Sequence, residues 1–305
     1  TDDDIVTYNT SDFDCNGAVD IEVLSAGYYH TCGIDSISMI HCWGIDDSSI
    51  YDYGQVSNYP NGSYSQVSAG GHHNCAVDTS GSVSCWGDDT YGQSTAPTGS
   101  FTQVSAGVNH SCGLDSTGTI QCWGIDDGSG YDYGQVTGAP TSSGFVSVSS
   151  GIEHSCALDS SGTVTCWGYD LFGQSSPPAG TFIQLSAGWY HNCALDSDNE
   201  IVCWGRNDYD QTVSPPSTFV HVSSGYGHSC AINYTSGVQC WGIDDDGPLD
   251  YGQATDIPLT GSYIQVEVGL WHSCALDNAG DVQCWGSDSD GQMSEVPTGY
   301  LSYPF

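Results

Sequence analysis

The sequence predicts an all-β fold made of seven tandem units, and three observations carry that prediction. Fourteen of the fifteen cysteines form seven pairs whose members stand ten positions apart. The first cysteines of successive pairs advance by 37 to 44 residues, a period typical of propeller blades and of solenoids. No segment shows the apolar spacing of a helix, and each unit divides into short strands. The predicted architecture is a single seven-bladed β-propeller with one hairpin disulfide per blade.

The third unit shows how each unit is built. We expect strands over Phe101–Ser105, His110–Leu114 and Thr119–Trp123. An Ala-Gly turn separates the first two strands, and the turn 115–118 separates the last two. A looser segment beginning at Gly134 closes the unit before a proline-bearing connection, and we expect it to supply a fourth strand.

The cysteine pairs test the hairpin independently. Opposed residues in an antiparallel hairpin have a constant index sum, so Cys75 and Cys85 must flank a turn centred on Ser80, within the turn-like sequence D-T-S-G. Such opposed cysteines need only slight tightening to reach disulfide geometry. Zinc is the weaker alternative, because each unit offers only two cysteines and lacks the C-x-x-C spacing. The predicted disulfides are Cys32–Cys42, Cys75–Cys85, Cys112–Cys122, Cys156–Cys166, Cys193–Cys203, Cys230–Cys240 and Cys274–Cys284.

The repeat resembles a known family. The units follow the pattern S-A-G-x-x-H-x-C-A-L-D and then G-x-V-x-C-W-G-x-D-x-x-G-Q, with small variations. This pattern is similar to the regulator of chromosome condensation repeat, in its cysteine-rich form from secreted bacterial proteins, and it covers roughly residues 19–299. The resemblance implies a seven-bladed propeller that serves as a binding platform, as in relatives that include a nuclear exchange factor, a plant ultraviolet receptor and β-lactamase inhibitors. One fold carries several functions here, so the resemblance does not choose among them.

The charge is strongly one-sided. There are 37 acidic residues against a single basic one, which gives a formal net charge of −36. This charge repels nucleic acid phosphates and anionic lipid headgroups, and no apolar run is long enough for a membrane helix, so we expect neither nucleic acid partners nor membrane insertion. The expected partners are therefore metal cations, basic proteins or neutral glycans. A saline habitat explains the acidity equally well. The cysteine pattern predicts an extracellular, secreted location, including attachment to a cell surface.

Two further residue types recur once per unit, a histidine two positions before the first cysteine and a tryptophan directly after the second. We expect the tryptophans to form the core between blades and the histidines to bond local backbone. His41, His72, His221, Trp189 and Trp271 fall outside the pattern. A catalytic site should break the repeat symmetry, so we expect no enzymatic activity. The repeated residues are His30, His73, His110, His154, His191, His228 and His272, and Trp43, Trp86, Trp123, Trp167, Trp204, Trp241 and Trp285.

Expanded loops in units one, three and six do break the symmetry. Each follows C-W-G and combines aspartates with a tyrosine. Equivalent loops of a propeller lie on one rim, where binding functions concentrate. Paired carboxylates with tyrosine suit Ca²⁺ or a basic partner, and solvated acidity is the alternative. The predicted rim residues are Asp46, Asp47, Asp52 and Tyr53, then Asp126, Asp127, Asp132 and Tyr133, then Asp244, Asp245, Asp250 and Tyr251.

An acidic segment precedes the first unit and resembles the D-x-D-C-D-G-x-x-D motif of bacterial secreted proteins. It has the spacing of the first part of a calcium loop, with Gly17 at the sharp turn. Position twelve of that loop is Val23 rather than Glu, so a complete EF-hand is not formed, and a plain Asp-rich turn is the alternative. The predicted metal-binding residues are Asp12, Asp14, Asn16, Ala18 and Asp20, with Ca²⁺ as a structural ion.

We therefore divide the chain into an N-terminal acidic segment over residues 1–18, the propeller over 19–299 and a tail over 300–305. Cys15 has no repeat partner, which indicates a free thiol or intermolecular pairing. The predicted function is an extracellular, non-enzymatic scaffold or adhesive propeller that assembles into a polymer or filament through its termini. The alternative is a soluble propeller that binds or inhibits another protein with the acidic rim of units one, three and six.

Overall fold

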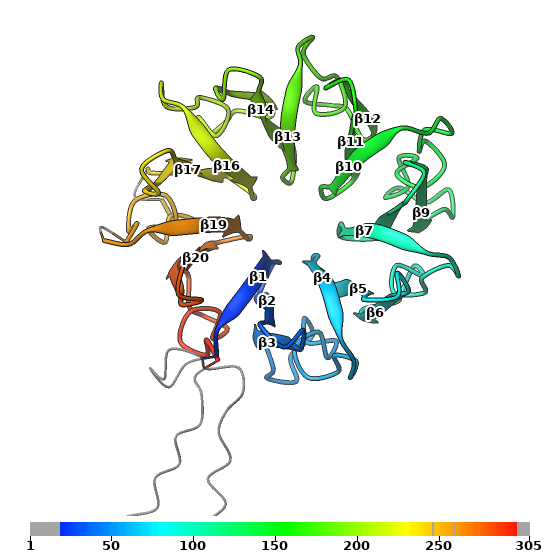
Figure 1. The fold of residues 1–305 in the computed structure, drawn as a ribbon, viewed down its shortest axis with the longest axis horizontal. Coiled ribbons are helices and arrows are strands. Elements are labelled where there is room, and N and C mark those ends of the chain that lie inside the picture. The colour runs from blue at the N-terminus through cyan, green and yellow to red at the C-terminus, as the bar shows by residue number, and fades with distance from the viewer. Residues whose placement is uncertain (1–18, 246, 259, 298–305) are drawn as a thin grey trace, which may run out of the picture.

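Seven three-stranded antiparallel sheets are arranged as blades around a central axis in the computed structural model (Figure 1). The structure describes residues 19–245, 247–258 and 260–297. The first strand of each blade lies nearest the axis, and the second and third strands follow outward in chain order. This arrangement confirms the predicted all-β, seven-bladed propeller. Within the described ranges no helix is long and apolar enough to cross a bilayer.

The strands recur with nearly constant lengths. Blade 1 contains β1 (Ile21–Ala26), β2 (His30–Asp35) and β3 (Ile40–Gly44), and blade 2 contains β4 (Tyr64–Ala69), β5 (His73–Asp78) and β6 (Val83–Gly87). Blade 3 contains β7 (Phe101–Ala106), β8 (His110–Asp115) and β9 (Ile120–Gly124), and blade 4 contains β10 (Phe145–Ser150), β11 (His154–Asp159) and β12 (Val164–Gly168). Blade 5 contains β13 (Phe182–Ala187), β14 (His191–Asp196) and β15 (Ile201–Gly205), and blade 6 contains β16 (Phe219–Ser224), β17 (His228–Asn233) and β18 (Val238–Gly242). Blade 7 contains β19 (Tyr263–Val268), β20 (His272–Asp277) and β21 (Val282–Gly286).

The prediction of a fourth strand is wrong for the described blades, because the Gly-Gln segment forms a compact turn instead. In blade 2 the buried Gln93 side chain accepts a hydrogen bond from the Tyr91 backbone at 2.8 Å and donates to Asp88 at 2.9 Å. The Gln93 carbonyl then accepts the indole N–H of Trp123 in the next blade at 2.9 Å. A backbone folded in this way cannot pair along the edge of a sheet.

The predicted disulfides are confirmed, one in each blade. Cys75 and Cys85 are direct partners in the register of β5 and β6, and their sulfurs are 2.06 Å apart. The same register holds for Cys230 and Cys240 in blade 6. Each bridge therefore joins the middle and outer strands of one blade and leaves the inner strand free to face the axis.

Apolar side chains fill the space between neighbouring blades. In one such cluster Trp86 and Val67 of blade 2 pack against Cys32, Ile34 and Ile40 of blade 1. The seven repeated tryptophans are all less than 10% exposed, which confirms their predicted place in the core between blades. The second strand of every blade is buried along most of its length, as expected for a strand covered on both faces.

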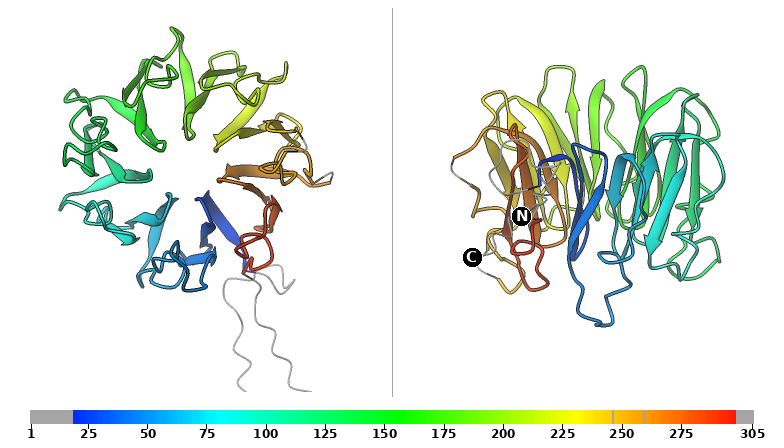
Figure 2. Two further views of the ribbon diagram at one scale, coloured as in Figure 1. Left: turned by 180° about the vertical axis from the view of Figure 1, so that it is seen from behind. Right: turned by 60° about the horizontal axis from the view of Figure 1, so that its bottom comes forward.

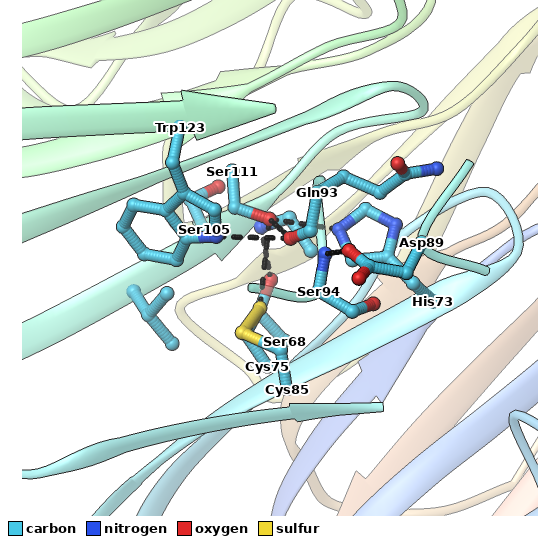
Figure 3. Close-up of a disulfide and its surroundings, with 12 residues drawn as sticks. Ser68, His73, Cys75, Cys85, Asp89, Gln93, Ser94, Ser105, Ser111 and Trp123 are labelled. Atoms are coloured by element: carbon cyan, nitrogen blue, oxygen red, sulfur yellow. Dashed lines mark hydrogen bonds between the residues drawn. A yellow bond between two sulfur atoms is a disulfide. The ribbon is translucent and has the colours of Figure 1, made fainter. Parts of the chain in front are cut away.

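The repeated histidines bind the next blade rather than local backbone, which corrects the predicted partner. Each Nε2 lies 2.7–2.9 Å from the side chain one position after the next blade's histidine. Figure 3 shows one of these contacts between blades. The Ser111 hydroxyl accepts a hydrogen bond from His73, lies 3.5 Å from the Cys75 sulfur and donates to the Gln93 carbonyl. The sequence around each histidine could not reveal its partner, because six partners stand 38–45 positions away and Thr31 stands 241 positions from His272.

The ring closes with the same bonds that join any two blades. His272 of blade 7 bonds Thr31 of blade 1 at 2.9 Å, and the Trp43 indole donates to the Gln292 carbonyl at 3.1 Å. The Ile21 backbone N–H also donates to the Gly280 carbonyl at 3.0 Å. Closure therefore adds no special element among the described residues and follows from the repeat itself.

Candidate functional site

Two sets of loops meet at one end of the propeller. The first set connects the first and second strands of each blade and holds the two variable positions of G-x-x-H. The second set follows C-W-G, and its first backbone N–H bonds the first set in every blade, as from Ile45 to the Tyr29 carbonyl at 2.9 Å. In the tilted view of Figure 2 the long blade loops extend beyond the strands. The expanded loops of units one, three and six therefore start at this same end.

Aromatic side chains gather on these loops and form what we call the aromatic face. Successive rings lie 4.5–6.4 Å apart, within the range of favourable aromatic pairs. Several rings are exposed, including Tyr51 at 47% and Tyr53 at 42%. The aromatic face consists of Tyr28, Tyr29, Tyr51, Tyr53, His72, Tyr133, Tyr169, Phe172, Trp189, Tyr190, Tyr209, Tyr226, Tyr251 and Trp271.

The centre of the aromatic face lines the axial cavity. Tyr28 of blade 1 and Trp189 of blade 5 meet there with ring centroids 4.6 Å apart. Both residues, with Val108, line a cavity of about 140 Å³ that lies around the axis. Contact between blades 1 and 5 links opposite sides of the ring, so this pair makes the face continuous across the axis.

The two tryptophans outside the repeat pattern belong to this face. Trp189 and Trp271 each lie 4.6 Å from the ring of Tyr226. At the blade 7 side the network continues to Tyr251 of the third expanded loop, 5.9 Å from Trp271. Blades 5, 6 and 7 therefore present one connected aromatic surface.

The predicted rim tyrosines join the aromatic face. Tyr53 lies 5.4 Å from the His72 ring, and Tyr133 lies 4.5 Å from the Tyr169 ring. Many of the predicted rim carboxylates bond the backbone of their own loop instead of pointing to a common site. The six carboxylates that bond their own loop are Asp47, Asp52, Asp127, Asp132, Asp245 and Asp250. The other three, Asp46, Asp126 and Asp244, are exposed.

The described part of the chain holds no group of three or more His, Cys, Asp or Glu side chains placed to bind a metal ion. Of the predicted calcium ligands only Asp20 is described, and it is buried beside the Gly280 turn. Asp12, Asp14, Asn16, Ala18 and the unpaired Cys15 lie outside the described residues. The calcium site there stays a prediction.

One acid stands in the inner part of the aromatic face. Glu153 occupies the second variable position of its G-x-x-H loop and is half-buried, and desolvation raises the pKa of its carboxyl group. Burial raises the pKa of Tyr190 to about 12, and the negative charge of Glu153 is the next cause. The same two causes, in that order, raise the pKa of Tyr133. The charge of Glu153 is therefore felt by the phenol groups of two neighbouring blades.

The single basic residue also lies here. The Arg206 guanidinium stands 5.3 Å from the centroid of the Phe172 ring and 5.9 Å from that of Tyr190. It also donates to Asp208 at 2.6 Å. Rings and a carboxylate together hold this cation on the face.

A second symmetry break lies inside the axial cavity. Six blades place a serine there that accepts a hydrogen bond from the next blade's backbone, such as Ser68 from Ala106 at 3.0 Å. Blade 7 has Glu267 instead, which accepts from Ser223 and Gln265 and lies 3.9 Å from His221 of blade 6. Burial raises the pKa of Glu267 to about 7.

Comparison with known families agrees with this architecture. A model described as "Regulator of chromosome condensation (RCC1) repeat" matches residues 64–93, 101–135, 145–174, 182–211 and 263–292. The chain belongs to the RCC1 repeat family. The matched segments are blades 2, 3, 4, 5 and 7, and each includes the repeated His, Cys, Trp and Gln. A search of curated protein sequences finds no match.

Solved structures share the fold of this RCC1 repeat protein. The CRINKLY WD40 ectodomain of the Arabidopsis thaliana receptor kinase ACR4 is 22% identical, with 90% of this chain and 98% of that chain covered and a TM-score of 0.71. The ectodomain of the Physcomitrella patens receptor kinase CR4 is 23% identical, with 88% and 74% covered and a TM-score of 0.69. Prp20p of Saccharomyces cerevisiae is 18% identical, with 87% and 82% covered and a TM-score of 0.64. Identities this low show the fold alone.

The aromatic face was missed by reasoning on the sequence, although a signal was present. The two positions between the turn glycine and the repeated histidine vary while their neighbours are nearly constant. They hold Tyr28 and Tyr29 in one unit and Trp189 and Tyr190 in another. Variation at a fixed place in a repeat marks the side chains that the fold itself does not need.

Proposed function

We propose that this chain is an extracellular, non-enzymatic propeller that binds another macromolecule on its aromatic face. The observation that carries this proposal is the continuous set of partly exposed rings at one end of the ring of blades. Aromatic side chains supply much of the binding energy in protein interfaces, and a stiff scaffold lowers the entropy lost on binding. Seven disulfides support an oxidising location, and two plant receptor ectodomains share the fold.

A binding role also agrees with another propeller that has this fold. Prp20p is described with binding properties to Gsp1p and histones. The expanded loops extend the face outward, and their aspartates hold the loop backbones in fixed turns, as Asp52 does through Ser48 and Gly54. Rigid, tyrosine-bearing loops on a stable scaffold suit recognition of a partner.

Binding to peptide and glycan arrays tests the proposal. We expect the labelled protein to bind a defined subset of spots, and a Tyr133→Ala/Trp271→Ala variant to lose about tenfold or more of that signal. Tyr234 provides the matched control, because it is 60% exposed and lies in the β17–β18 turn at the opposite end of blade 6. Equal binding by both variants, or loss with Tyr234→Ala alone, would contradict the aromatic face as the binding surface.

A second candidate is the scaffold that assembles through its termini. Val19 and Val296 pack in one cluster, so the two ends of the described propeller lie together and both terminal segments start from the same place. Cys15 supplies a thiol outside the seven bridges. Gel electrophoresis without reductant and light scattering should then show polymers that the Cys15→Ser variant lacks, whereas monomers alone would count against assembly.

A further inference from the structure

The geometry points to a cation-binding subsite at Glu153, and we infer that it takes the cationic side chain of a lysine or arginine from a partner polypeptide. This inference rests on the proposed function and names the chemistry of its ligand. Four observations carry it: the place of Glu153 in the repeat, the rings around it, the one cation already on the face, and the charge of the whole chain.

Glu153 is the only acid at its place in the repeat. The equivalent positions hold Tyr29, His72, Asn109, Tyr190, Gly227 and Trp271. The side chain of Glu153 has no hydrogen bond or ion pair to a described residue, whereas its backbone carbonyl bonds the Tyr169 N–H at 2.8 Å. A half-buried carboxylate without a partner of opposite charge is costly, so a ligand that supplies the charge is favoured.

The rings around Glu153 come from three blades. Tyr133 and Tyr169 lie 4.5 Å apart, and Tyr169 and Tyr190 lie 5.9 Å apart. Glu153 belongs to this group of residues, because its backbone carbonyl bonds the Tyr169 N–H at 2.8 Å and its equivalent in blade 5 is Tyr190. Its negative charge also raises the pKa of Tyr133, Tyr190 and Tyr28. A carboxylate on the same loops as several aromatic rings suits ammonium and guanidinium groups, which bind through ring quadrupoles and one opposite charge.

Arg206 shows this chemistry within the same molecule. Arg206 in blade 5 is equivalent to Tyr169 in blade 4. The backbone N–H of Arg206 bonds the Tyr190 carbonyl, just as the backbone N–H of Tyr169 bonds the Glu153 carbonyl. Its guanidinium stacks over Phe172 and Tyr190 and reaches Asp208. One side of the Tyr190 cluster therefore already holds a cation, and the Glu153 side lacks one.

Other ligand classes fit less well. A hard metal ion needs six or more oxygens, and the described residues place no group of carboxylates for it. Anions are repelled by a net charge of −36. A neutral sugar can stack on the rings but gives no charge to the Glu153 carboxylate. A lysine or arginine side chain satisfies both the rings and the acid.

Calorimetric or fluorescence titration with singly charged peptides tests the subsite. The probes are acetylated, amidated tripeptides with a central lysine, trimethyl-lysine or arginine, and the neutral control carries acetyl-lysine. We expect the cationic peptides to bind and the neutral one to bind about tenfold more weakly or not at all. Glu153→Gln should weaken cationic binding about tenfold, and Glu153→Asp should restore part of it. Asp198→Asn removes the same charge from an exposed position in the β14–β15 turn, at the opposite end of the propeller, and should change binding less than twofold.

Each other outcome overturns the inference. Equal losses in Glu153→Gln and Asp198→Asn would mean that only the overall electric field of the protein attracts cations. Equal binding of the acetyl-lysine peptide, or of a neutral oligosaccharide, would make the face a neutral site. Absence of binding by the wild-type protein would remove the subsite, while array binding sensitive to Trp271 would leave the proposed function standing. Urea midpoints of the variants at pH 7.5 verify that each is folded.

Discussion

Mild acid should unfold this propeller, because its seven repeated histidines, which join neighbouring blades, must stay neutral. Burial lowers the pKa of these imidazoles to about 3 or 4, from an ordinary value of 6.5. In each repeated histidine Nε2 bonds the next blade, and Nδ1 is buried without a hydrogen bond. A second proton on Nδ1 would therefore have no acceptor for its hydrogen bond. Protonation therefore favours the unfolded chain.

The size of the effect follows from linkage. When the folded pKa is depressed below the unfolded one, the unfolded state binds more protons, so stability is full above pH 6.5 and falls as the pH decreases toward 3–4. A difference of one in pKa corresponds to about 1.4 kcal/mol. At pH 5 each histidine costs about 2 kcal/mol, and all seven cost about 14 kcal/mol, which matches the whole stability of a typical domain, ~5–15 kcal/mol. Glu267 has the opposite effect, because its raised pKa lets it stabilise the fold as the pH falls, by at most about 3 kcal/mol.

Urea unfolding followed by tryptophan fluorescence between pH 7.5 and pH 5 measures this dependence with the disulfides intact. We expect the free energy of unfolding to fall by up to about 9 kcal/mol per pH unit below pH 6.5. His110→Gln, whose amide can still donate to Ser155, should reduce that slope by about 1.4 kcal/mol per pH unit. A free energy of unfolding that stays constant down to pH 5 would refute the conclusion that the seven repeated histidines are buried and neutral between the blades.

Three further predictions concern single positions. Gly107→Ala should lower stability by about 3 kcal/mol, because a Cβ there would lie 2.6 Å from the Gly151 carbonyl, while Gly130→Ala, with open space around it, should change urea midpoints little. Glu267→Gln should stabilise the fold by up to about 3 kcal/mol at pH 8 and little at pH 4.5, since a raised pKa costs wild-type stability as pH rises from 4.5 through about 7; an equal gain at both pH values would contradict this. Trp86→Phe should cost about 2 kcal/mol by calorimetry, because the indole bond to the previous blade is lost, and an unchanged melting temperature would show that this bond adds nothing.

Local geometry made much of the fold predictable from the sequence. Cys75 and Cys85 fixed the register of their hairpin because the turn between them is short, and the third unit's strands agree with the structure within about a residue at each end. The expected fourth strand was wrong because the Gln93 side chain bonds its own turn, which no hydrophobic pattern reveals.

Contacts between blades escaped prediction because they join residues far apart in the chain. His73 and Ser111 stand 38 positions apart, so only the closed ring shows that the histidine serves the neighbouring blade. The meeting of Tyr28 and Trp189 across the axis likewise depends on the ring. The rim aspartates were identified as candidate ligands by composition, but several of them, such as Asp132, hold their own loops in shape.

Hydroxyl-radical footprinting of the protein with its strongest array ligand tests the aromatic face most directly. We expect the oxidation of Tyr53, Tyr190 and Trp271 to slow when the ligand is bound, while Tyr234 at the opposite end reacts at an unchanged rate. Protection of Tyr234, or unchanged oxidation across the aromatic face in a saturated complex, would contradict the account.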